Sequence, residues 1–268
     1  MKAFIFLLLI AVTAPAAAQE LFVYTEPASN MPAHSIGLRL NNWLMVERGA
    51  SNLNYHLVPE VMWGVNKNLM LHAEAFLSNR NKAFTAEGAG LYAKYRILSK
   101  DALNRHFRMA AYGRLAFNNS DIHMEEIEIN GHNSGFEAGL IATQLLHRTA
   151  LSATASFEQA RNNGAGNELP QHFNRNAVNY SLSAGHLFYP KTYTTYKQTN
   201  INAMLEVLGQ ANTGSGRYYI DAAPALQFIF NSQTRLDVGY KFELAGTLQR
   251  TAPNGLLIRV EHLLFNAL

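Results

Sequence analysis

Apolar and polar residues alternate one by one along much of this chain, most strictly between positions 235 and 244. There Leu, Val, Tyr, Phe and Leu occupy the even positions, while Arg, Asp, Gly, Lys and Glu occupy the odd ones. Successive side chains of an extended strand point to opposite faces of a sheet. Because the period is two, the segment predicts a β-strand with one apolar face and one charged face.

About twelve such segments follow one another, separated by Asn, Gly, Ser, Lys and Asp residues that favour turns. No helical period is sustained over three turns, and no Pro- or Gly-rich linker divides the chain. The pattern predicts an all-β fold of antiparallel strands, about twelve in number within a range of ten to fourteen. We expect the strands at 35–47, 55–65, 69–78, 85–97, 105–118, 135–146, 149–159, 177–189, 199–209, 217–231, 234–246 and 255–268.

Two architectures fit alternating strands: a soluble β-sandwich in the periplasm and a transmembrane β-barrel. The segments approach the nine to eleven or so residues that a tilted strand needs to cross a bilayer. We therefore interpret residues 35–268 as one outer-membrane barrel and keep the sandwich as the alternative. Aromatic residues toward the segment ends resemble the girdles of membrane barrels: Trp43, Trp63, Tyr95, Phe117, Phe188, Tyr189 and Phe230.

The predicted connections differ in length between the two ends of the strands. Those after odd-numbered strands are longer, above all 119–134 and 160–176, while those after even-numbered strands are mostly tight. Two even-strand connections, 98–104 and 190–198, are longer than the rule. Outer-membrane barrels have short periplasmic turns and longer outer loops. We therefore expect 119–134 and 160–176 to be the two largest surface loops.

The N-terminus has the three-part layout of a secretory signal. Lys2 precedes an apolar run at 4–12, and small residues at 16–18 follow Pro15. The run is too short to span a bilayer as a helix. We expect a signal peptide at 1–18, an N-terminal lead at 19–34, and export to the outer membrane of a Gram-negative bacterium.

Composition narrows the classes of function. The chain has 268 residues, of which 15% are charged, a formal net charge of +3 and no Cys. So small a positive surplus does not suggest nucleic-acid binding. The absence of Cys excludes a disulfide scaffold, a Cys-ligated metal and a Cys nucleophile.

Charged residues recur on the face opposite the apolar one in nearly every predicted strand. A barrel of about twelve strands has a lumen wide enough for water, but long side chains can still fill it. Acids and bases are nearly balanced, so the lumen is either a plug of salt bridges or a narrow channel that selects polar solutes. The predicted lumen-lining residues are Arg39, Glu60, His72, Glu74, Lys94, Arg96, Arg108, Arg114, Glu206, Asp221, Arg235, Asp237, Lys241, Glu243, Arg259 and Glu261.

Catalytic and metal-binding motifs are weak. Ser181 and Ser183 share one face of a strand, but His186 points to the other, so they form no same-strand pair. His123, His132 and His172 fall in the two longest loops, where we expect solvated side chains and no metal ligands. The sequence predicts no catalytic residues, no metal and no cofactor, and it favours a barrel without enzymatic activity. The expected partners are outer-membrane lipid and a small solute.

Three short motifs carry a resemblance to a known group. They are the run MPAHSIGLR at 31–39, Lys94-Tyr95-Arg96 at the end of a strand, and PALQ at 224–227. Together with the Tyr- and Asn-rich strands they resemble small exported barrels of Bacteroidetes-type bacteria. That group is similar to the MetA-pathway-of-phenol-degradation family of outer-membrane transporters. The resemblance implies a porin-like or uptake role and no catalytic residues.

These observations lead to one expected function and two alternatives. We expect porin-like passage or binding of small polar or aromatic solutes through a charge-lined lumen. The first alternative is an outer-membrane lipid hydrolase, and the second is a structural or adhesion barrel that acts through its outer loops.

Overall fold

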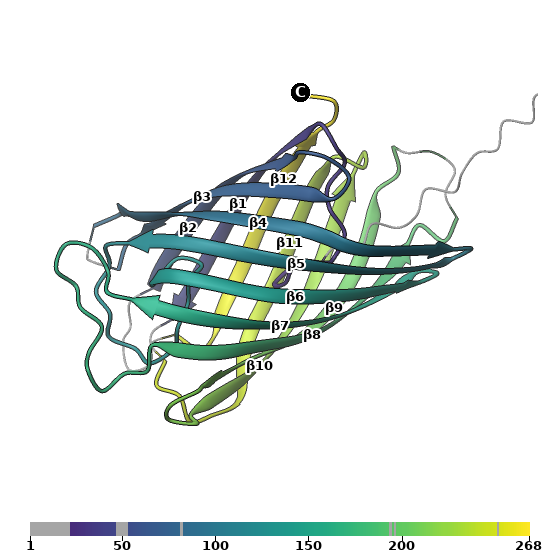
Figure 1. The fold of residues 1–268 in the computed structure, drawn as a ribbon. Coiled ribbons are helices and arrows are strands. Elements are labelled where there is room, and N and C mark those ends of the chain that lie inside the picture. The colour runs from purple at the N-terminus through teal and green to yellow at the C-terminus, as the bar shows by residue number, and fades with distance from the viewer. Residues whose placement is uncertain (1–21, 47–52, 81–82, 193–194, 196, 251) are drawn as a thin grey trace, which may run out of the picture.

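Twelve antiparallel strands form one closed barrel in the computed structural model (Figure 1). The structure describes residues 22–46, 53–80, 83–192, 195, 197–250 and 252–268, so the predicted signal peptide lies outside the described residues. The predicted fold class and strand number are confirmed. The strands are β1 (Ser35–Val46), β2 (Leu53–Gly64), β3 (Leu69–Ser78), β4 (Thr85–Ala102), β5 (Arg105–Asn118), β6 (Ser134–Leu146), β7 (Thr149–Arg161), β8 (Asn176–Tyr189), β9 (Asn200–Asn212), β10 (Tyr218–Phe230), β11 (Thr234–Gly246) and β12 (Gly255–Leu264).

Each strand pairs with its neighbours along the chain, and the first pairs with the last. The pairing of β1 with β12 places Arg39 opposite Glu261. Because the barrel is closed, neither β1 nor β12 is a free edge strand, which is the condition for a sheet to lie in lipid. Among the described residues, no helix is long and apolar enough to cross a membrane.

The connections follow the predicted asymmetry with one correction. The longer loops after odd-numbered strands gather at one end of the barrel, on the left in Figure 1, and the tight turns lie at the other end. The predicted connection at 98–104 is wrong, because β4 and β5 both continue to a turn of Leu103 and Asn104. Asn104 has a positive φ of 58°, a conformation that Asn tolerates better than most residues. The connection after β8 is longer, as predicted.

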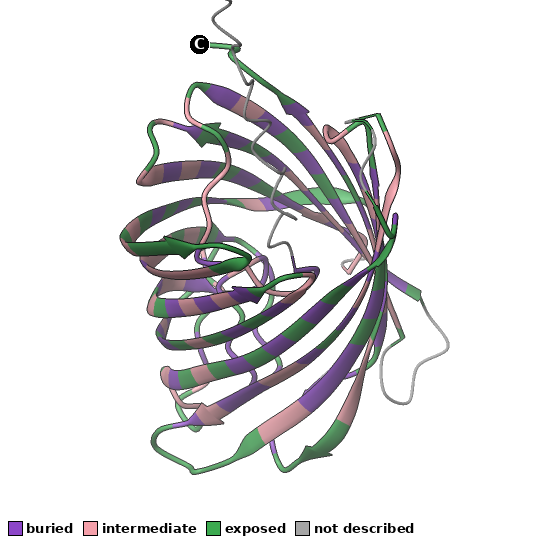
Figure 2. Ribbon diagram, turned by 90° about the vertical axis from the view of Figure 1, so that its right-hand side faces the viewer, coloured by how far each residue is buried: buried purple, intermediate pink, exposed green. Residues whose placement is uncertain are grey.

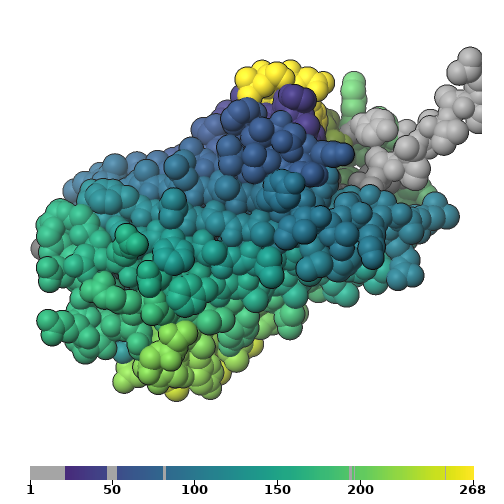
Figure 3. Space-filling view, viewed as in Figure 1, coloured from purple at the N-terminus to yellow at the C-terminus, as the bar shows by residue number. Residues whose placement is uncertain are grey.

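The outer face of the wall is apolar. Buried and exposed residues alternate along the strands, which Figure 2 shows as bands of colour. The outward positions hold large exposed side chains such as Leu91, Leu115 and Leu182, each 63% exposed. Figure 3 shows the outer wall unbroken on the side of Figure 1, with the strands side by side in chain order. Apolar surface of this extent on a folded chain marks contact with lipid or protein.

The prediction of an outward aromatic girdle is wrong for one residue, Trp43. Trp63, Tyr95, Phe117 and the other predicted aromatic residues are exposed outward, but Trp43 is half-buried inside the barrel. The residue was assigned from its position near a strand end. The two-residue period places it on the same inward face as Arg39.

Candidate functional site

Ion pairs run around the inside of the barrel from strand to strand. The register places Arg235, Glu261, Arg39 and Glu60 side by side on β11, β12, β1 and β2. Arg39 contacts Glu261 at 2.7 Å and Glu60 at 3.2 Å, while Arg235 contacts Glu261 at 2.8 Å. The row continues to Glu74 on β3, which faces Glu60 directly. Opposite charges on neighbouring strands therefore neutralise most of this buried belt.

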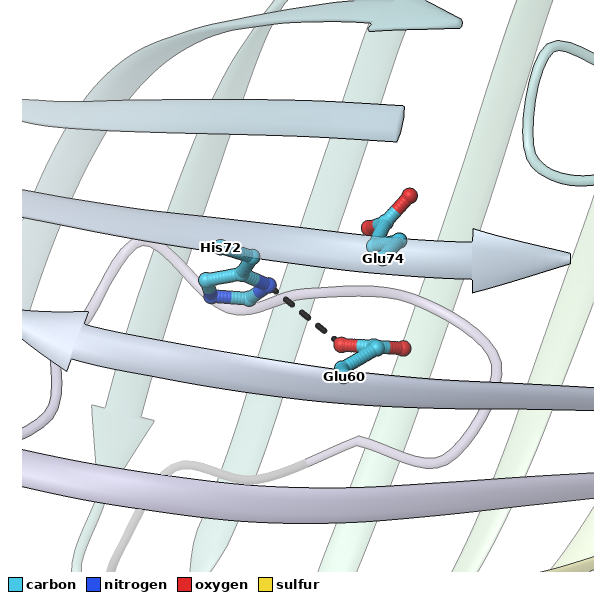
Figure 4. A group of neighbouring side chains, drawn as sticks. All are labelled: Glu60, His72 and Glu74. Atoms are coloured by element: carbon cyan, nitrogen blue, oxygen red, sulfur yellow. Dashed lines mark ion pairs between the residues drawn. The ribbon is translucent and has the colours of Figure 1, made fainter. Parts of the chain in front are cut away.

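The like-charged pair Glu60 and Glu74, with His72 beside them, forms the one candidate metal centre that the described residues offer (Figure 4). The potential ligand atoms lie within 4.8 Å of one another, and His72 Nδ1 lies 3.4 Å from Glu60. Arg39 already contacts Glu60, and Arg114 contacts Glu74 at 3.4 Å. Because two guanidinium groups would repel a cation here, the cluster is better explained as part of the ion-pair belt.

The remaining predicted lumen residues are also placed on the inner side, although they do not form one site. Lys94 and Arg108 bond to the segment before β1, and Glu206 holds that segment as described below. Most of the others pair within the wall or with the loop after β11; these are Arg114, Asp221, Asp237, Lys241, Glu243 and Arg259. Arg96 is half-buried on β4, where its backbone N–H donates to the carbonyl oxygen of Asn68 in the turn that joins β2 and β3.

Residues 22–34, the N-terminal segment, run inside the barrel and are held by one carboxylate of the wall. The backbone N–H groups of Val23, Tyr24 and Thr25 donate to Glu206 at 2.8, 2.8 and 3.0 Å. Thr25 adds its hydroxyl at 2.7 Å, and Ser183 bonds the same carboxylate at 3.1 Å. Glu206 is fully buried. This buried carboxylate is therefore satisfied by hydrogen bonds from uncharged N–H and O–H donors. Hydrogen bonds to a charged acceptor are stronger than those to a neutral one.

Further along the N-terminal segment, basic residues of the wall take over. Glu26 pairs with Arg39 at 2.7 Å and with Lys94 at 3.4 Å. Lys94 also donates to the carbonyl oxygens of Pro27 and Ser29. Burial alone would raise the pKa of Glu26, but Arg39 and Lys94 outweigh it and hold that pKa well below its ordinary range. The segment is therefore fixed to the wall on two sides.

The structure of residues 119–133, the inner loop, corrects another prediction. We expected a solvated outer loop, but Ile122, Ile127 and Ile129 are buried in an apolar cluster with Leu169 of the next long loop. The amide of Gln210 on β9 bonds both the N–H and the carbonyl of Ile127, at 2.9 and 2.7 Å. The loop contains no strand.

Histidine 132 of the inner loop is also buried, against the expectation of a solvated side chain. It is 1% exposed, and the guanidinium of Arg80 contacts its ring. Burial, followed by the Arg80 charge, holds the pKa of His132 well below 6.5. The ring is therefore neutral near neutral pH.

A single arginine of the loop after β11 clamps the inner loop to the wall. Arg250 is 3% exposed and makes two hydrogen bonds to Glu126, both at 3.0 Å, and two to Asp221, at 2.7 and 2.9 Å. Burial alone would raise the pKa of Glu126, but Arg250 and Lys241 outweigh it and lower the pKa. By contrast, burial and the neighbouring Glu126 raise the pKa of Glu128.

A cavity of about 240 Å³ remains between the N-terminal segment and the inner loop. Both aromatic and charged side chains line this cavity. The rings of Tyr92 and Tyr112 lie 5.5 Å apart, and those of Tyr24 and Trp43 are separated by the same distance. Pockets of this kind orient a ligand with a few polar groups on an apolar wall.

The serine residues singled out in the sequence do not form a hydrolase site. Ser183 bonds to Glu206 and Thr25, whereas His186 bonds to Thr149. The structure therefore keeps Ser183 and His186 apart, as the strand parity predicts.

Sequence reasoning missed the residues that fill the lumen. Gln210 and Arg250 were not singled out, and the lead at 19–34 was given no role. The sequence signal that could have identified the inner loop is its three isoleucines at 122, 127 and 129, because isoleucine side chains are usually buried.

Comparison with solved structures shows the fold of bacterial outer-membrane barrels. An outer membrane channel from Pseudomonas putida F1 is 12% identical with a TM-score of 0.57, and the match covers 91% of this chain and 100% of that one. Two others match at a TM-score of 0.40. They are OccAB4 of Acinetobacter baumannii, at 10% identity over 83% of this chain and 56% of that one, and OccK11 of Pseudomonas aeruginosa, at 9% over 86% and 96%.

Sequence comparisons place the chain in no family. No family model matches it, and no curated protein matches it. The similarity to the Pseudomonas putida channel concerns the fold alone. The likeness to the MetA-pathway-of-phenol-degradation family therefore remains a resemblance carried by short motifs.

Proposed function

We propose that this chain is an outer-membrane barrel through which small polar or aromatic solutes pass, and that two inner segments close its lumen at rest. The observation that carries the proposal is the cavity of about 240 Å³ inside the barrel, which is lined by charged and aromatic groups. A barrel with only a structural role has no need of such a cavity, because side chains alone can fill a lumen of this size.

The proposed location follows from the outer wall. Exposed leucine side chains around the barrel are unfavourable in water, whereas the acyl chains of a bilayer accommodate them. The Pseudomonas putida protein with a similar fold is described as an outer membrane channel, which supports the proposal by analogy of fold alone.

The proposal that the lumen is closed at rest follows from how the N-terminal segment and the inner loop are held. Hydrogen bonds and ion pairs fix the N-terminal segment to Glu206 and Arg39, and they fix the inner loop to Gln210 and Arg250. Each contact is reversible, so an open state requires no change in the strand pairing of the wall. Rearrangements of such inner segments belong to the microsecond-to-second range of protein motions.

The test is solute flux through the reconstituted protein. Heat-modifiable migration in SDS gels first establishes a folded barrel. Liposomes that contain the protein are then assayed for swelling in small neutral, aromatic and charged solutes. A second sample uses a variant that lacks residues 22–33. We expect low permeability with the full chain and higher permeability with the variant. If both folded samples are as tight as empty liposomes, solute passage is excluded.

A further inference from the structure

Two carboxylates on the cavity wall have no basic partner among the described residues. Glu158 on β7 stands directly opposite Glu137 on β6. Arg114 pairs with Glu137 at 3.3 Å, which leaves Glu158 with amide partners such as Gln210 at 3.2 Å. Glu128 faces the same cavity from the inner loop, and no ion pair to it forms within the described part of the chain.

The basic residues of this wall are already engaged. Arg114 is shared by Glu74 and Glu137, and Lys241 lies 3.8 Å from Asp221. The fourth acid of the wall, Glu26, is neutralised by Arg39 and Lys94. Pairing each base with its own acid therefore leaves two carboxylates in excess. Charges inside the barrel are screened less than charges at the surface, so such an excess attracts a cation more strongly here.

The aromatic rings around the cavity already bind cations of the protein. The Arg114 guanidinium lies over Tyr92 at 5.2 Å, and the Lys241 ammonium lies over Trp43 at 5.7 Å. Aromatic faces attract ammonium and guanidinium groups, and cages of such rings recognise quaternary ammonium ligands. A bare metal ion would make no use of these rings.

Two buried polar groups of the wall have no hydrogen-bond partner among the residues that the structure describes. They are the hydroxyls of Tyr92 and Ser181, which are only 3% and 7% exposed. Buried polar groups are nearly always satisfied in folded proteins. A ligand with its own hydroxyl or amine group would satisfy them.

On the basis of the proposed function, we propose that this cavity selects small organic cations, that is amines or quaternary ammonium compounds. Glu128 and Glu158 supply the charge, while Tyr24 and Tyr112, which line the cavity beside Trp43 and Tyr92, supply aromatic faces. The volume of about 240 Å³ admits a compact molecule such as choline.

The experiment uses the fluorescence of Trp43 as a probe inside the cavity. The chain has two Trp residues, and Trp63 faces outward. Trp63→Phe therefore leaves one reporter on the cavity wall. The folded variant in detergent is titrated to equilibrium with choline chloride, at an ionic strength held constant with NaCl. We expect a saturable change in emission.

Three comparisons make the result specific. The neutral isostere of choline, 3,3-dimethylbutan-1-ol, should bind at least about tenfold more weakly, because it lacks the charge. Glu128→Gln and Glu158→Gln should each weaken choline binding about tenfold or more. Glu125→Gln is the matched control for Glu128→Gln, since Glu125 pairs with the exposed Arg217, is not among the residues that line the cavity, and should leave binding unchanged.

Contrary outcomes are equally clear. Equal binding of choline and its neutral isostere would show an apolar cavity with no selection for charge. Saturation by CaCl₂ without saturation by choline would show a metal site. Either result overturns the inference, as does the absence of any choline response in folded protein. Choline binding without flux in liposomes would instead reject solute passage and leave the inference intact.

Discussion

The N-terminal segment and the inner loop both fill the lumen, yet different chemistry holds each of them. The N-terminal segment offers backbone N–H groups to one buried carboxylate, Glu206. The inner loop is clamped by a buried arginine, Arg250, between Glu126 and Asp221. Loss of Arg250 would leave two buried negative charges, whereas loss of Glu206 would leave neutral donors that water can satisfy. The inner loop should therefore be the easier segment to release by a single substitution.

The largest effect is expected for Arg250→Ala. Breaking a buried ion pair by removing one partner typically costs about 3–5 kcal/mol. The strand pairing of the wall does not depend on Arg250, so we expect the inner loop to leave its site while the barrel stays folded. Single-channel conductance should rise about tenfold or more, and amide exchange should accelerate in 119–133. Unchanged conductance in a heat-modifiable variant would show that the inner loop does not close the lumen.

A smaller effect is expected for Glu206→Ala. Each buried donor that loses its acceptor costs about 1–3 kcal/mol when no water replaces it. Ala leaves space for water beside Val23 and Thr25, so part of this cost is recovered. Amide exchange should accelerate at 22–25, while conductance should rise less than in Arg250→Ala. Glu206→Gln keeps one acceptor oxygen and should lie between the wild type and Glu206→Ala. The reverse order of conductance for the two Ala variants would invert the comparison.

The wall of the barrel was predictable from sequence, and its contents were not. Each strand of this barrel pairs with its neighbours along the chain, so the two-residue period alone decides which face each side chain takes. This is true of Arg39 and equally of Trp43, although the girdle prediction placed Trp43 on the outer face. The inner segments depend on contacts such as Glu206 with Val23 and Arg250 with Glu126. These contacts join residues more than a hundred positions apart, and no local pattern records them. That Glu158 has no basic partner among the described residues was equally hidden, because its partner strand and register had to be known first.

Acidification should separate the two segments. In the inner loop the pKa of His132 is held well below 6.5, so the stability that the neutral ring contributes is present above pH 6.5 and is lost as the pH falls below it. In the N-terminal segment the pKa of Glu26 is held well below 4.5, so its contribution begins to fall only below pH 4.5. Between these two values we expect the inner loop to loosen while the N-terminal segment stays in place.

Glu128 works against this trend, because its raised pKa makes proton uptake favourable in the folded loop. The measurement is therefore made on Glu128→Gln, with amide exchange or proteolysis of the two segments followed at a series of pH values. His132→Asn in the same background is the control, since it removes the titrating ring and should abolish loosening above pH 4.5. Simultaneous loosening of both segments would mean that they form one unit.

The smallest effect is expected for Arg217→Ala, which tests whether charge alone holds the inner loop. Arg217 contacts Glu125 at 2.6 Å, a shorter distance than any contact between Arg250 and Glu126, but its side chain is 51% exposed. Water and salt screen such a pair, so exposed ion pairs contribute little despite good geometry. We expect conductance within about twofold of the wild type and amide exchange unchanged in 119–133. An effect as large as that of Arg250→Ala would show that the loop is held by the number of ion pairs and not by their burial.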